Sequence, residues 1–176
     1  NKDVHHLVYE LLKKTFARHI EKMLDLMEKI FQVVCIDLES NNNENKVMAI
    51  DFWVGVAIAE KDKNLHSIIA TAAPKLVPVF LGFLISDRDT DRKISINDND
   101  DKDLDDEIVI DSEMNDNSNV IDITILCLRC FVEAEKDTVF PLILPFINET
   151  FYSDNILLNI ASINATYSVL KFTDFY

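Results

Sequence analysis

Glycine and proline are scarce in this sequence, with 2 Gly and 4 Pro among 176 residues. Both residues favour turns and interrupt helices, so their scarcity argues against turn-rich sheets and favours long helices. The sequence also lacks the glycine-rich loops that cradle phosphate groups, since it contains neither a G-x-G-x-x-G motif nor a P-loop. We therefore expect an all-α fold without a nucleotide-binding loop.

Cysteine and histidine are too few and too scattered to indicate a catalytic or metal site. The three cysteines are an odd number, which does not suit a disulfide framework and favours a reducing compartment. Cys127 and Cys130 form a C-x-x-C pair without a second pair or a nearby histidine, so we expect buried structural cysteines. No nucleophile–base arrangement is present, and we expect no enzymatic activity, cofactor or metal.

Positive charge is also in short supply, because the formal net charge is −14. Such a surface repels nucleic acids and anionic lipids, and it attracts basic partners. Residues 87–116 contain 13 Asp or Glu and 4 Lys or Arg, so most of the net charge comes from this segment. Its low hydrophobicity and high charge predict an acidic, flexible insert over residues 87–118.

One apolar run, residues 68–85, reaches the length of a membrane span. Lys75 lies near its middle, and inserting a charge at the centre of a bilayer is costly. A helix buried between other helices is therefore the favoured interpretation, and no membrane insertion is expected. The chain starts with Asn-Lys-Asp and has no apolar leader, so we expect it to begin inside a longer protein.

Seven segments have the length or the hydrophobic spacing of α-helices. They are too long for strands and lack the period-two alternation of strands. The expected helices cover residues 4–16, 19–38, 46–60, 65–85, 119–134, 137–151 and 155–172.

Some of these segments resemble each other, which indicates an internal repeat. LVPVFLGFL (76–84) matches VFPLILPFI (139–147), and VMAIDFWVGVAIAE (47–60) matches VIDITILCLRCFVE (120–133). A weak repeat of paired antiparallel helices is typical of an α-α superhelix, the solenoid of HEAT and armadillo repeats. We expect three to four helix pairs, with the long acidic loop inside one repeat.

The order of these segments resembles the HEAT repeats of the importin-β (karyopherin-β) family of nuclear transport receptors. KVMAIDFWVGVAIAEKD (46–62) is similar to a second helix of that family, and AAPKLVPVFLGFL (72–84) is similar to the first helix of the next repeat. An acidic loop follows, and then CLRCFVEAEKDTVFPLILPFINETFYSD (127–154), which resembles the helices after that loop. The resemblance covers nearly the whole chain and implies a middle segment of a longer superhelix.

The resemblance implies a receptor that binds proteins reversibly in the cytoplasm, the nucleus and the nuclear pore. The second helix of each pair would line a concave face, which accepts basic cargo or the basic helix of an importin-α-like adaptor. The candidate residues on that face are Asp51, Trp53 and Glu60. The outer helix 19–38 would hold half of a slot for phenylalanine-glycine (FG) nucleoporins, with the other half upstream of residue 1.

The acidic loop is the second expected binding surface, because the family's loop engages the adaptor's basic helix and takes part in binding the GTPase Ran. Residues 98–107 contain seven carboxylates, which would attract a polycation and speed its encounter. The candidate residues are Asp98, Asp100, Asp101, Asp103, Asp105, Asp106 and Glu107. A solvated insertion without a partner is the competing interpretation of this stretch.

The role of Trp53 and the class of the whole protein each allow two interpretations. Trp53, the single tryptophan, is either a core residue or a platform on which a Lys or Arg stem stacks. The chain could also be a HEAT or armadillo scaffold that assembles a protein complex, such as a phosphatase scaffold, with no part in transport. The acidic insert favours the transport receptor, because a generic scaffold does not need it at that turn.

Overall fold

The computed structural model describes residues 2–85 and 116–170, and every regular element in these two ranges is a helix. The elements are α1 (Lys2–Met23), the short 3-10 helix η1 (Leu24–Leu26), α2 (Met27–Leu38), α3 (Asn43–Asp62), α4 (Ile68–Ile85), α5 (Asp116–Ala134), α6 (Lys136–Thr150) and α7 (Ile156–Leu170). The expected acidic insert stands between α4 and α5 in the sequence, and its residues 87–115 lie outside the described ranges.

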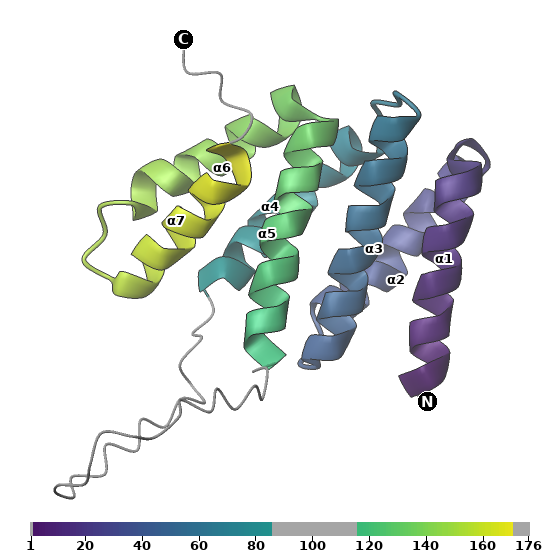
Figure 1. Cartoon of the computed structure of the whole chain (residues 1–176), viewed down its shortest axis with the longest axis horizontal. Helices are drawn as coiled ribbons and strands as arrows, with labels where there is room; N and C mark the ends of the chain where they lie inside the picture. The colour runs from purple at the N-terminus through teal and green to yellow at the C-terminus, as the bar shows by residue number, and fades with distance from the viewer. Residues whose placement is uncertain (1, 86–115, 171–176) are drawn as a thin grey trace, which may run out of the picture.

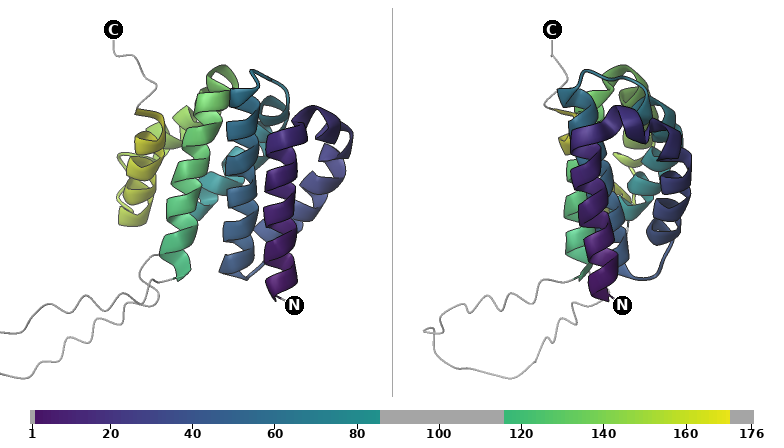
Figure 2. Two further views of the ribbon diagram at one scale, coloured as in Figure 1. Left: turned by 45° about the vertical axis from the view of Figure 1, so that its right-hand side comes forward. Right: turned by 90° about the vertical axis from the view of Figure 1, so that its right-hand side faces the viewer.

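The helices form two layers that advance along one direction (Figure 1, Figure 2). The helices α1, α3 and α5 lie side by side in one layer, with α2 and α4 in the other. At the far end α6 contacts α4, and α7 contacts α5. This arrangement confirms the expected all-α solenoid, with α1 followed by the pairs α2–α3, α4–α5 and α6–α7.

The expected break between helices 4–16 and 19–38 corresponds to a kink inside α1. Helix α1 continues to Met23 with a kink at His19, whose φ of −135° and ψ of 32° are not helical. Phe16 and Ile20 are buried on either side of the kink, and α1 packs against α3. The kink therefore joins two helical stretches within α1, and the short helix η1, which buries no residue, follows the second of them.

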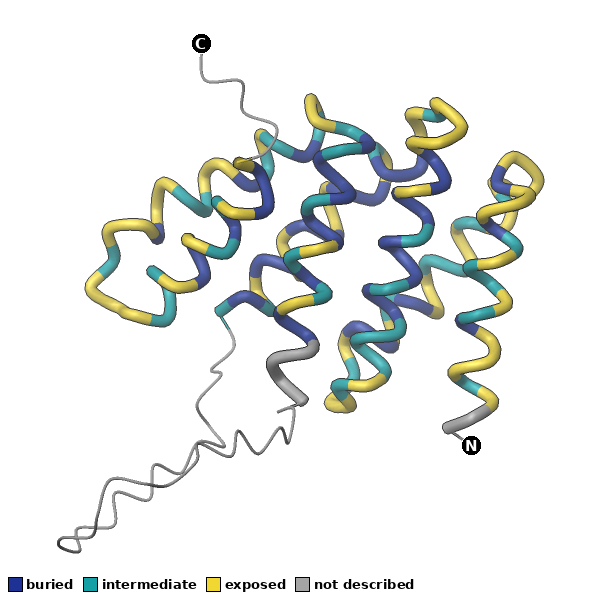
Figure 3. Tube along the Cα trace, viewed as in Figure 1, coloured by how far each residue is buried: buried dark blue, intermediate teal, exposed yellow. Residues whose placement is uncertain are grey.

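A chain of aromatic rings forms the centre of the core. Tyr9 of α1 contacts Phe52 of α3, and the next residue, Trp53, contacts Phe131 of α5. Phe131 in turn contacts Phe80 of α4, and the ring centroids of these three pairs are 5.7 to 6.2 Å apart. All three pairs have the edge-to-face geometry that aromatic pairs prefer. Buried positions accordingly line the facing sides of the layers, and exposed positions gather at the turns and the two ends (Figure 3).

A buried carboxylate, Asp37, joins α1 and α3 to the end of α2. The hydroxyl of Tyr9 donates a hydrogen bond of 2.6 Å to Asp37 Oδ2, and Asn45 Nδ2 donates to Asp37 Oδ1 over 3.4 Å. His5 Nε2 lies 3.1 Å from Asp37 Oδ2. Burial, together with the hydrogen bond to Asp37, raises the pKa of Tyr9 far above its ordinary value, so the phenol remains a donor.

Within the described ranges, α4 is the one helix that is long and apolar enough to cross a membrane. Half of its residues are buried inside the structure, where it contacts α5, α6 and α7. Pro74 and Pro78 lie inside this helix, and Lys75 between them is exposed. This packing favours the interpretation of residues 68–85 as a buried helix.

Candidate functional site

A groove with a volume of about 860 Å³ lies between α2 and α4. One wall comes from η1 and α2, the other comes from the first turns of α4, and Trp53 of α3 contributes to the lining between them. We call it the α2–α4 groove, and its lining residues are Leu24, Met27, Glu28, Phe31, Gln32, Cys35, Ile36, Trp53, Ser67, Ile68, Thr71, Ala72 and Lys75. Its volume is in the range of pockets that bind ligands.

The lining of the α2–α4 groove is mainly apolar, and two of its residues are aromatic. Phe31 packs edge-to-face against Trp53, with ring centroids 5.7 Å apart. The exposed Lys75 places its Nζ 5.4 Å from the centroid of the Phe31 ring, a cation–π contact. Burial, followed by the nearby Glu39 carboxylate, raises the pKa of the half-buried Cys35 thiol, which therefore stays uncharged. Such a surface is suited to apolar and aromatic side chains.

Ion pairs link the neighbouring helices α1, α3 and α5. Lys13 of α1 pairs with Asp51 of α3, and Lys61 of α3 pairs with Glu133 of α5 over 2.7 Å. The hydrogen bond from Lys61 holds the pKa of Glu133 below its ordinary value, although partial burial opposes this shift. Arg129 Nε lies 3.4 Å from the same carboxylate. These carboxylates are therefore already paired within the chain.

Asp51, one of the three residues expected on the concave face, is paired with a lysine of α1. Asp51 is half-buried and holds the ammonium group of Lys13. The stem of Lys13 passes close to Gly55, where an added Cβ would lie 3.4 Å from Lys13 Cγ. The partner-binding role expected of Asp51 stays a prediction of the sequence.

Trp53 does not offer the exposed platform that was expected of a partner-binding residue. Its side chain is 0% exposed, and it packs among Phe31, Phe52 and Phe131. That expectation is wrong because α3 lies between α1, α2 and α5, which leaves little of its surface free. The interpretation of Trp53 as a core aromatic residue is correct, with the addition that the residue also lines the α2–α4 groove.

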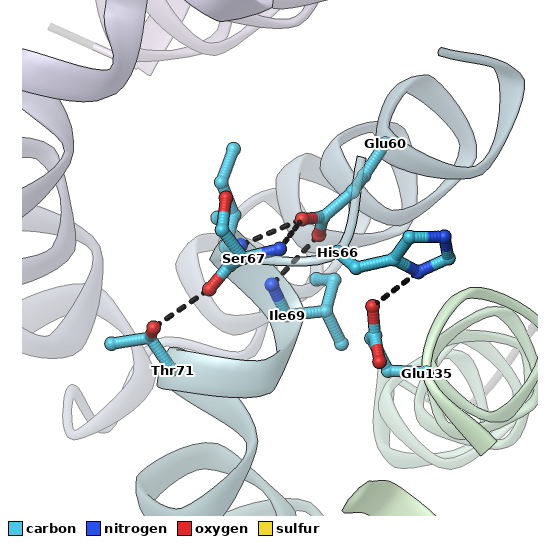
Figure 4. Close-up of polar contacts among 7 residues, drawn as sticks. Glu60, His66, Ser67, Ile69, Thr71 and Glu135 are labelled. Atoms are coloured by element: carbon cyan, nitrogen blue, oxygen red, sulfur yellow. Dashed lines mark hydrogen bonds and ion pairs between the residues drawn. The ribbon is translucent and has the colours of Figure 1, made fainter. Parts of the chain in front are cut away.

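Glu60 has a structural role in place of the expected partner-binding role. It is fully buried near the end of α3, and its carboxylate accepts hydrogen bonds from the backbone N–H groups of Ser67, Ile68 and Ile69 over 2.6, 2.6 and 2.7 Å (Figure 4). Backbone N–H groups at the start of a helix have no partner within it, and a negative charge there is stabilising. The carboxylate therefore caps α4, which begins at Ile68 and not at residue 65 as the sequence predicts.

Beside this cap, the turn between α3 and α4 contacts the junction of α5 and α6. His66 Nδ1 lies 2.7 Å from Glu135 Oε1 (Figure 4). The ion pair of Lys61 with Glu133 crosses between the same two repeats. Polar contacts thus link successive repeats on the side of the molecule where the α3–α4 turn and the α5–α6 junction lie.

The seven loop residues that are expected to bind a partner lie outside the described residues. They are Asp98, Asp100, Asp101, Asp103, Asp105, Asp106 and Glu107. Their role therefore stays a prediction of the sequence.

The two cysteines of the C-x-x-C pair are both buried in α5 as free thiols. Burial is the main cause of the raised pKa of Cys127 and of Cys130. Within residues 4–85 and 120–170, no group of three His, Cys, Asp or Glu side chains could hold a metal ion.

The sequence does not reveal the second wall of the α2–α4 groove. The slot on helix 19–38 is expected to be completed upstream of residue 1, whereas in the structure Ile68, Ala72 and Lys75 of α4 form the facing wall. These residues are spaced by three and four positions, which is one face of a helix. The spacing is hidden in the sequence because nearly every neighbour in residues 68–85 is also apolar.

Comparison with known proteins finds a solved structure with a similar fold. No family model and no curated protein matches the sequence. Among solved structures, the chain is similar to one in a structure of Kap95p bound to RanGDP, described as inducing the switch loops to adopt the GTP-bound conformation. The TM-score is 0.71 at 17% identity, and the similarity covers 97% of this chain and 19% of that chain. The likeness shows a HEAT-repeat fold, and the chain spans about a fifth of the length of that neighbour.

Proposed function

We infer that the chain is a segment of an importin-β-like nuclear transport receptor that works by reversible protein binding. The observation that carries this proposal is the similarity to the Kap95p structure over 97% of the chain, at a TM-score of 0.71. That structure concerns a Ran complex and the assembly of nuclear import complexes. By this analogy Ran is a partner, and the protein moves between cytoplasm and nucleus through the pore.

The exposed faces of the two end helices support a longer superhelix. α1 and α7 each expose several large apolar side chains, although they stand at opposite ends of the stack. On α7 these residues recur every three or four positions, which forms one continuous stripe. The exposed residues are Val4, Leu7, Val8 and Leu11 on α1, and Ile156, Ile160, Ile163, Tyr167 and Leu170 on α7. Terminal repeats of solenoids carry a polar outer face, so these stripes suit internal repeats.

The surfaces of the chain divide among the partners of such a receptor. The α2–α4 groove would receive phenylalanine side chains of FG nucleoporins, because its lining is apolar and aromatic. The acidic residues 98–107 would attract basic cargo, the basic helix of an importin-α-like adaptor, and Ran. The paired charges on α1, α3 and α5 would add a second polar surface for a basic ligand.

The acidic residues can be tested by charge neutralisation. Binding of the chain to a Lys/Arg-rich peptide and to Ran loaded with GTP would be measured by calorimetry, before and after all seven acids in residues 98–107 are changed to Asn or Ser. A control of nearly equal charge changes the six acids that flank this stretch, which are Asp87, Asp89, Asp91, Asp111, Glu113 and Asp116. The proposal expects the first variant to bind more weakly than the control and to lose much of its salt dependence, since charges are screened over about 8 Å at physiological salt.

The groove has its own test, with a peptide of phenylalanine-glycine units as the probe. Phe31→Ala removes the aromatic wall, while Val33→Ala is the matched control because Val33 is exposed on the same helix and does not line the groove. Only the first change should weaken binding. If the unmodified chain binds none of the three probes, the transport proposal is wrong and the generic HEAT scaffold becomes the better interpretation.

A further inference from the structure

Two neighbouring lysines of α1 are held in different ways. Lys14 is 70% exposed, and its Nζ lies 3.5 Å from Glu10 on the same helix. Lys13 is 27% exposed and reaches across to α3, where its ammonium group holds the Asp51 carboxylate. The stem of Lys13 lies along Gly55, since a Cβ added there would be 3.4 Å from Cγ and 3.5 Å from Cε of the lysine. Because Gly55 follows Asp51 by four positions, the whole lysine side chain lies on one face of α3.

A hollow with a volume of about 560 Å³ opens beside this lysine, between α1 and α3. Ala17, Gly55 and Ala59 line it with little or no side chain, so another chain can come close to the two helices there. Lys13 also contributes to the lining, and Asp51, which it holds, keeps 37% of its side chain exposed. A group that enters the hollow can therefore reach the Asp51 carboxylate once Lys13 turns away into solvent.

The charges around the hollow balance only while Lys13 is in place. Three carboxylates and three ammonium groups lie there, from Glu10, Asp51, Asp62, Lys13, Lys14 and Lys63. When Lys13 turns away, one carboxylate loses its counter-charge, and the space that becomes free fits one cation on a long, narrow stem. An ion pair that water reaches contributes little to stability, so the exchange of Lys13 for another cation costs little.

We propose that Lys13 is a built-in competitor, which occupies the place that a lysine or arginine of a basic partner takes at Asp51. This inference rests on the proposed function, in which α1, α3 and α5 offer a polar surface to a basic ligand, and it names the regulation of that surface. In the free chain Lys13 keeps the site closed. The partner opens it by displacing Lys13, with its own stem along Gly55 and its cation on Asp51. A single cation competes poorly against a tethered lysine, so the site selects partners that bring several cations.

Matched lysine variants test this competition by calorimetry. The probe is an acetyl-capped arginine-rich peptide, and every chain carries Asn or Ser in place of the seven acids of residues 98–107, so that these acids do not bind the peptide. Lys13→Ala removes the competitor, and Lys14→Ala removes the same charge from the neighbouring residue, which leaves the long-range attraction equal. Lys13→Ala should bind the peptide about two- to fivefold more tightly than Lys14→Ala. With Asp51→Asn added to each, the two variants should bind alike.

Acetylation of lysines adds a measurement that a purely structural ion pair would not change. In the same background with both lysines present, the peptide should raise the labelling of Lys13 by acetic anhydride, because its arginines do not react and Lys13 is displaced into solvent. Mass spectrometry would compare Lys13 with Lys14. If Lys13→Ala binds no more tightly than Lys14→Ala, or if the bound peptide does not raise the labelling of Lys13, the inference is wrong and the proposed function stands. If the chain does not bind the peptide in any of these forms, the helical surface for a basic ligand is wrong, and this inference fails with it.

Discussion

Removing the Glu60 carboxylate tests whether it determines where α4 begins. Glu60→Ala leaves the backbone N–H groups of Ser67, Ile68 and Ile69 without their acceptor. Ser67 is exposed, so water can replace the carboxylate there, whereas Ile68 and Ile69 are buried. Each buried donor that loses its partner costs about 1–3 kcal/mol, so the free energy of unfolding should fall by about 2–6 kcal/mol. The total free energy of unfolding of a typical domain is about 5–15 kcal/mol.

Urea unfolding followed by far-UV circular dichroism measures this loss. With a denaturant slope of about 2 kcal/mol per molar, the midpoint should fall by about 1–3 M. Glu60→Gln should lie between the wild type and Glu60→Ala. Its amide oxygen can still accept from Ser67 and Ile68, but its NH₂ group would face the N–H of Ile69, where two donors meet.

Glu149→Ala is the matched control, because Glu149 is an exposed carboxylate on α6. Its unfolding free energy should stay within about 0.5 kcal/mol of the wild type. If Glu60→Ala lowers stability no more than this control, the capping argument is refuted. If Glu60→Gln is as stable as the wild type, the charge of the carboxylate is irrelevant and one acceptor oxygen suffices.

Two further predictions concern other polar contacts. Tyr9→Phe removes the hydroxyl that donates to the buried Asp37. In a urea titration the free energy of unfolding should fall by about 1–3 kcal/mol. An unchanged midpoint would mean that Asn45 and His5 are sufficient partners for the Asp37 carboxylate. Because the folded pKa of Glu133 lies below its ordinary 4.5, its ion pair with Lys61 stabilises the fold above about pH 4.5 and is lost as the pH falls further. The difference between wild type and Glu133→Gln should therefore be about 0.2–1 kcal/mol at pH 7 and vanish in acid, and a difference that persists at pH 3 would contradict this assignment.

The layout of the helices could be predicted from the sequence because hydrophobic spacing is a local property of the chain. The repeated patterns in residues 47–60 and 120–133 indicate paired helices, and α3 and α5 do lie side by side in one layer. The break near residue 18 could also be predicted, since it corresponds to the kink at His19. No local pattern reveals, however, that Phe16 and Ile20 on either side of the kink are held in the core by other helices.

The sequence by itself thus determined an all-α solenoid, its weak repeat and the position of the acidic stretch, since helix propensity, periodicity and charge are carried by neighbouring residues. Tertiary structure decided the roles of individual side chains. Trp53 lies in the core beside a groove, and Glu60 caps a helix, although both stand on α3 where a concave-face role was expected. The groove itself arises between α2 and α4, which are separated by α3 in the chain. Such features depend on which helices meet, and that is decided by packing across the whole fold.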